Sequence, residues 1–179
     1  MNEIITILQE CHRLVWQYRA ELEPYWPTPT TDDALLFAFT ELGEAVDAHL
    51  RSKPEYARNR DKDLDVLDEL ADCAMMLLTA LEDVDGNSLI FVRDEEIGSF
   101  PELAWNLSMA MVKQADRRSW DSYALFAAGL IVRFPDMDLP ARLTARLNRI
   151  KAKRMPKPKI TIDDAYAALS IAVDGDKEP

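Results

Sequence analysis

The stretch ALLFAFTELGEAVDAHL occupies residues 34–50, and DELADCAMMLLTAL follows at residues 68–81. The first contains five consecutive apolar residues, LLFAF, so a helix formed here is apolar on every face and is expected to be buried on every face. In the second, Asp72 is the only charged residue after position 70. Two such stretches predict a pair of helices at the centre of a helical fold.

Helical patterns continue on both sides of this pair. Apolar residues recur every three or four positions over residues 4–22, and the prolines of PYWPTPT end that helix. The further predicted helices span residues 32–51, 61–81, 101–117, 121–134 and 139–154. Residues 89–98 fit either one extended strand or an irregular segment. Only 5 of 179 residues are glycine, which disfavours a sheet-rich fold.

We therefore predict a single all-α domain over residues 1–160, built as a bundle of five or six main helices. A short helix and a frayed tail are expected over residues 161–179. Several helices are apolar around most of their circumference, and a lone bundle of this length has few places to bury them. Completion of the bundle by homo-oligomerisation is expected, with a dimer favoured over a tetramer.

Composition excludes several classes of function. There are 21 Lys and Arg against 32 Asp and Glu, a net charge of −11, which argues against nucleic-acid binding because that requires clustered cations. No apolar run is long enough to cross a membrane, and the acidic N-terminus is unlike a signal peptide. Cys11 and Cys73 lie in helical patterns, as expected of reduced thiols in a cytoplasmic protein. Two histidines and no paired cysteines exclude zinc sites of the Cys/His type.

The two central helices each carry a pair of acidic residues three positions apart. Glu41 and Glu44 share one face of the first helix, and Glu69 and Asp72 share one face of the second. One interpretation is a solvated acidic face. However, Asp72 lies among apolar residues, where an unpaired carboxylate is costly, and the pattern occurs on both helices.

Two facing pairs form a pocket of four carboxylates, whose repulsion is relieved by raised pKa values or by divalent cations. Oxygen ligands favour Mg²⁺ or Mn²⁺. A di-iron bundle takes histidines from Glu-x-x-His motifs, and neither histidine here follows a glutamate at that spacing.

The pattern E-x-x-E, 24 intervening residues, then E-x-x-D resembles the MazG-like all-α nucleoside triphosphate pyrophosphohydrolases, over roughly residues 24–82. That family includes dimeric dUTPases, dCTP pyrophosphatases and phosphoribosyl-ATP pyrophosphatases. The resemblance implies that Glu41, Glu44, Glu69 and Asp72 are Mg²⁺ ligands and catalytic residues. The family's first motif usually begins with a further glutamate, and Thr40 stands at that position. The number of metal ions and the water-activating base therefore stay open.

Positive charge for a phosphate substrate is concentrated near the end of the predicted domain. Eight of the 21 basic residues lie between Arg142 and Lys159. We expect Lys151 and Arg154 to bind substrate, although the same charges also suit a helix C-terminus or a partner's acids. Trp26 precedes the first acidic helix and is a candidate for stacking on a base, although most tryptophans are core residues.

The resulting prediction is a cytoplasmic hydrolase that uses Mg²⁺, or Mn²⁺, to cleave a (deoxy)nucleoside triphosphate between its α and β phosphates. The products are a monophosphate and pyrophosphate. Its expected partners are the nucleotide and further copies of the chain, without nucleic acid or membrane. Two alternatives stay open: a phosphoribosyl-ATP pyrophosphatase, and a non-catalytic helical interaction module.

Overall fold

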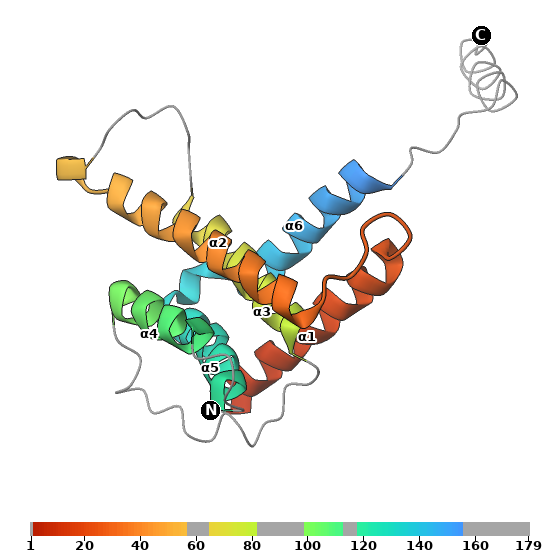
Figure 1. Ribbon diagram of the computed structural model, residues 1–179, viewed down its shortest axis with the longest axis horizontal. Coiled ribbons are helices and arrows are strands. Elements are labelled where there is room, and N and C mark those ends of the chain that lie inside the picture. Colours follow the sequence, from red (N-terminus) through yellow and green to blue (C-terminus); the bar gives the residue numbers. More distant parts are fainter. Residues whose placement is uncertain (1, 57–64, 82–98, 113–117, 156–179) are drawn as a thin grey trace, which may run out of the picture.

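A computed structural model describes residues 2–56, 65–81, 99–112 and 118–155, and this part of the chain is all-helical with no strand. The described residues form six α-helices, whose arrangement is drawn in Figure 1. They are α1 (Asn2–Leu22), α2 (Thr31–Arg51), α3 (Val66–Ala80), α4 (Phe100–Val112), α5 (Arg118–Arg133) and α6 (Leu139–Arg154), with short 3-10 turns at Pro54–Tyr56 and Pro135–Met137. None of the described helices is both long and apolar enough to pass through a membrane.

The predicted helices are largely confirmed, with differences at their ends. Thr30 caps α2 by accepting a hydrogen bond from the backbone N–H of Asp33. The predicted start of the next helix at residue 61 is wrong, because Asp65 adopts an extended conformation and caps α3, which begins at Val66. The ambiguous segment 89–98 and the terminal helix expected within residues 161–179 lie outside the described residues.

Helix α3 is the central element of the fold. Every residue from Leu70 to Ala80 is buried, and α3 packs against α1, α2, α5 and α6. Its longest contact is with α2, which runs antiparallel to it (Figure 1). A helix surrounded on all sides can be apolar on all sides, which explains the run of apolar residues after Asp72.

The expectation that α2 is buried on every face is wrong for the single chain. Ala34, Leu35 and Ala38 are buried, but Leu36, Phe37 and Phe39 are 63%, 54% and 50% exposed. Because α2 packs mainly along α3 and touches α4 on one side, the other described helices do not cover its opposite face. Packing among the described residues of one chain therefore does not explain the apolar composition of α2.

Candidate functional site

Three of the four predicted carboxylates converge between α2 and α3. Glu41, Glu69 and Asp72 each offer an oxygen, and these oxygens lie within 4.8 Å of one another. Glu41 comes from the middle of α2, while Glu69 and Asp72 are one turn apart at the start of α3. The antiparallel pairing of the two helices brings these residues together, as the repeated spacing predicted.

Burial and mutual repulsion shape the acidity of this cluster. The pKa of Glu41 is raised to about 7, first by burial and then by the charges of Asp72 and Glu44. Burial, followed by the charge of Asp72, also raises the pKa of Glu69. The cluster therefore lacks enough positive charge nearby to balance its carboxylates when all are ionised.

Glu44 stands apart from the other three. It is exposed and is not a member of the group whose oxygens lie within 4.8 Å. Its charge nevertheless contributes to the raised pKa values of Glu41 and Glu69. The structure thus places Glu44 at the outer edge of the cluster, within electrostatic range of it.

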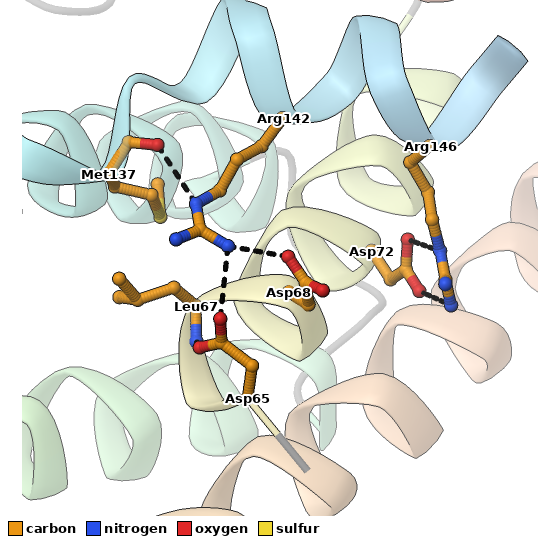
Figure 2. Close-up of polar contacts among 7 residues, drawn as sticks. All are labelled: Asp65, Leu67, Asp68, Asp72, Met137, Arg142 and Arg146. Atoms are coloured by element: carbon orange, nitrogen blue, oxygen red, sulfur yellow. Dashed lines mark hydrogen bonds and ion pairs between the residues drawn. The ribbon is translucent and has the colours of Figure 1, made fainter. Parts of the chain in front are cut away.

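Arg146 of α6 is the cation closest to the cluster. Its Nε donates to Oδ1 of Asp72 at 2.7 Å, and its Nη2 contacts Oδ2 of the same carboxylate (Figure 2). The Asp72 side chain is 4% exposed, and burial still raises its pKa despite the opposing effect of Arg146. This two-point contact fixes the orientation of the carboxylate and neutralises it in part.

A cavity of about 390 Å³ opens beside the cluster. Glu41 and Asp72 lie on its wall together with the cationic residues Arg146, Arg149, Lys153 and Arg154 of α6. The remaining lining residues are the buried cation Arg19 and a mainly apolar set from several segments: Trp26, Pro27, Pro29, Phe37, Met75, Met76 and Ile150. A volume of this size fits a small-molecule ligand, and the lining offers anionic, cationic and aromatic groups to it.

The predicted substrate-binding residues divide into two groups. Arg154 and Trp26 line the cavity, as expected of substrate contacts. Lys151 does not line it; its Nζ instead donates to the carboxylate of Glu21 on α1 at 2.7 Å. Helix α6 has one face toward the cavity and another toward α1, and Lys151 lies on the second.

Sequence reasoning did not single out Arg146, Arg149 or Arg19. The signal for the first two was present, because positions 146, 149 and 153 follow helical spacing and share a face that excludes Lys151. Arg19 had a signal of the same kind, because it lies four residues after Val15 and three before Leu22, on the apolar face of the predicted helix. Comparison of the chain with family models, characterised proteins and solved structures finds no match.

Proposed function

We propose that this protein is a Mg²⁺-dependent hydrolase that cleaves a (deoxy)nucleoside triphosphate between its α and β phosphates. One observation carries the proposal: a carboxylate cluster and a row of cations face the same cavity. Glu41 and Asp72 provide the anionic wall, and α6 provides the cationic one. A metal-bound polyphosphate needs both, because the cation requires oxygen ligands and the phosphates require positive charge.

The cluster fits a hard divalent cation by its chemistry. Glu41, Glu69 and Asp72 offer only oxygen donors. Burial first and mutual repulsion second raise the pKa values of Glu41 and Glu69, and a bound cation would offset both. Mg²⁺ held there supplies charge neutralisation and alignment of phosphate oxygens. Mn²⁺ is an acceptable substitute because it also prefers oxygen ligands.

The side chains of α6 have the complementary role. Arg149, Lys153 and Arg154 line the cavity without an ion pair to any described carboxylate. They are therefore free to contact phosphate oxygens, which favours binding and stabilises the charge that builds up as the bond to the leaving pyrophosphate breaks. A carboxylate of the cluster accepts the proton of the attacking water.

The resemblance of the two acidic motifs to MazG-like pyrophosphohydrolases supports the same reaction. Within this proposal, phosphoribosyl-ATP is a second candidate substrate. A non-catalytic interaction module is the rival class, and the exposed side chains of Leu36, Phe37 and Phe39 would suit it. The two classes differ in what Mg²⁺ should do.

A panel of standard and modified nucleoside triphosphates, with phosphoribosyl-ATP included, tests the proposal. Monophosphate and pyrophosphate are measured separately with Mg²⁺ and with a chelator. We expect equal amounts of both products, only with metal, and a higher melting temperature in Mg²⁺ because the ion binds the folded state. Release of orthophosphate would contradict cleavage between the α and β phosphates. Absence of both turnover and metal stabilisation would favour the interaction module.

We further propose that the chain forms a homo-oligomer, with a dimer favoured. The large apolar side chains exposed on α2 support it, since such patches commonly mark an interface. Light scattering at micromolar concentration should give a mass above the 20.4 kDa of one chain. A cytoplasmic location belongs to the same proposal, supported by Cys11 and Cys73, which are both buried and unbonded.

A further inference from the structure

Arg19 on α1 is a buried cation with an unused hydrogen-bond donor. The residue is 1% exposed. Its Nε donates to Oγ1 of Thr79 and its Nη2 to Sδ of Met76, both at 3.4 Å. Its Nη1 has no hydrogen-bond partner among the described residues. Thus one amino group of a buried guanidinium is left unsatisfied.

This arrangement is costly without a ligand. Arg19 forms no ion pair with any described carboxylate, and both of its hydrogen bonds are long contacts to weak or neutral acceptors. A buried donor without a partner costs about 1–3 kcal/mol, and more when it is charged. Burial lowers the pKa of Arg19 to about 10, so the group remains a cation at neutral pH. The charge of Glu23 acts against this lowering, but Glu23 makes no ion pair with Arg19 among the described residues. A buried cation with a spare donor beside a cavity indicates a binding role.

Arg19 lines the same cavity as the carboxylate cluster, but at some distance along α3. Its contacts Met76 and Thr79 are four and seven residues beyond Asp72. At a rise of 1.5 Å per residue, these positions are about 6 and 10 Å from Asp72 along the helix axis. That offset places Arg19 on a different part of the cavity wall from the carboxylate cluster.

The surroundings of Arg19 suit a flat aromatic ligand group. The Trp26 ring lies over the guanidinium, with 3.8 Å between the guanidinium carbon and the ring centroid. Pro27, Pro29 and Met75 line the cavity as well. The cations proposed to contact phosphates therefore lie along α6, while the wall with Arg19 and Trp26 is apolar and aromatic apart from one cation.

We propose that Arg19 is a specificity-determining residue, whose Nη1 donates to a keto oxygen at the base position farthest from the sugar. This inference rests on the proposed function and names its substrate class: nucleotides with a keto group, such as uracil or hypoxanthine, and not an amino group, such as cytosine or adenine. A guanidinium only donates hydrogen bonds, so it pairs with a keto oxygen and repels an amino group.

Binding at this position requires a small local movement. Nη1 is closed off from solvent in the ligand-free chain. The neighbouring Met76 side chain is flexible and Trp26 belongs to the connection between α1 and α2, so either can shift to admit the ligand oxygen. The incoming oxygen then satisfies the donor that is unsatisfied in the free protein.

Two matched nucleotide pairs test this assignment independently of turnover. Binding of dUMP against dCMP, and of dIMP against dAMP, is measured by titration calorimetry. Within each pair, one nucleotide has a keto group and the other an amino group at the base position farthest from the sugar. The two bases of a pair have the same ring size. We expect the wild-type protein to bind the keto member about tenfold tighter or more. Arg19→Met and Arg19→Gln should reduce this preference to near unity, because neither keeps an obligate donor.

Arg13→Met is the matched control, since Arg13 lies on the exposed face of the same helix and bonds only to Gln17 among described residues. It should keep the wild-type preference. With triphosphates, Arg19→Met should lower the ratio of kcat/KM for dUTP over dCTP by about 10-fold or more.

Absence of a keto preference in the wild-type protein would overturn the inference, even if neither Arg19 variant folds. An equal loss of affinity for both members of a pair in a folded variant would also overturn it, because a structural or phosphate-binding role predicts that result. Failure of every triphosphate to be hydrolysed would refute the proposed function alone, since the monophosphate titrations involve no turnover.

Discussion

Two arginines one turn apart on α6 bind aspartates of α3, yet their surroundings differ (Figure 2). Arg142 contacts Asp68 at 2.5 Å and Asp65 at 3.3 Å, and its Nε donates to the backbone carbonyl of Met137. The side chains of Asp65 and Asp68 are 50% and 43% exposed. Arg146 contacts Asp72, whose side chain is 4% exposed.

The two contacts differ in the balance of charge around them and in their exposure to solvent. Around Arg142, solvent screens the two carboxylates, which are about half exposed. Around Arg146, the single buried aspartate is joined by Glu41 and Glu69, and all three have raised pKa values. At Arg142, the arginine–aspartate contact fastens α6 to the start of α3. At Arg146, the same type of contact leaves surplus negative charge beside a cavity.

The largest expected effect comes from neutralising one aspartate of each contact. Asp72→Asn should reduce Mg²⁺-dependent hydrolysis by about 10²-fold or more, because metal positioning supplies most of the catalysis. Asp68→Asn should keep turnover within about threefold, since Arg142 retains Asp65 and the Met137 carbonyl. Steady-state kinetics on the best substrate from the panel measures both.

Glu41→Gln and Glu69→Gln should reduce hydrolysis as Asp72→Asn does. Asp47→Asn is a further control and should be much milder, because Asp47 pairs with Arg51 on the outside of α2. Glu44→Gln is also predicted to impair turnover strongly, which tests whether a carboxylate at the outer edge of the cluster acts as a ligand. Full metal-dependent activity in Asp72→Asn would show that the site assignment is wrong.

Truncating each arginine should show which of the two aspartate contacts is linked to metal binding. Arg146→Met leaves the buried Asp72 without its cation and should lower the free energy of unfolding by about 2–3 kcal/mol without metal. Added Mg²⁺ should restore much of this loss. Arg142→Met removes partly exposed contacts and should cost about 1 kcal/mol, with no recovery in Mg²⁺. Urea unfolding with and without Mg²⁺ gives the free energy of unfolding of both variants. An equal response of the two variants to Mg²⁺ would show that neither contact is specifically linked to the metal site.

The raised pKa of Glu41 predicts a pH dependence of the metal-free protein. Its pKa is about 7 in the folded chain against about 4.3 when unfolded. Between these values the folded state holds a proton that the unfolded state has released, so this residue lowers stability as pH rises through the interval. Glu41→Gln should therefore gain melting temperature relative to wild type by a few degrees, on the order of 2–5 °C, at pH 8 and less at pH 5. An equal gain at both pH values would contradict this origin.

The smallest effect concerns the two basic residues predicted to bind substrate. Arg154→Ala should raise KM for the triphosphate several-fold and leave kcat nearly unchanged, because Arg154 lines the cavity. Lys151→Ala should change KM little, because Lys151 binds Glu21 and lies 5.7 Å from the Tyr18 ring centre. A larger increase in KM for Lys151→Ala would show that its contact with α1 is exchanged for substrate.

Much of the fold follows from local pattern. The start of α2 at Thr31 and the span of α6 at Leu139–Arg154 match the predicted ranges closely, because caps, prolines and apolar spacing act within a few residues. The start of α3 was missed because Asp65 caps the helix, while Asp61 and Asp63 offer the same capping group by sequence. The juxtaposition of Glu41, Glu69 and Asp72 was predictable because both pairs have helical spacing on consecutive antiparallel helices.

By itself, the sequence determined the helices, the central position of α3 and the two facing acidic pairs, since each depends on spacing along one or two adjacent helices. Only the tertiary structure decided that Glu44 lies outside the group formed by Glu41, Glu69 and Asp72, and which cations face the cavity. Arg146 and Lys151 are equally basic in sequence, but the packing of α6 against both α3 and α1 brings one to Asp72 and the other to Glu21. The hydrogen bonds of Arg19 likewise depend on residues 57 and 60 positions away, Met76 and Thr79. Contacts of this range are set by packing of the whole bundle, which no local pattern contains.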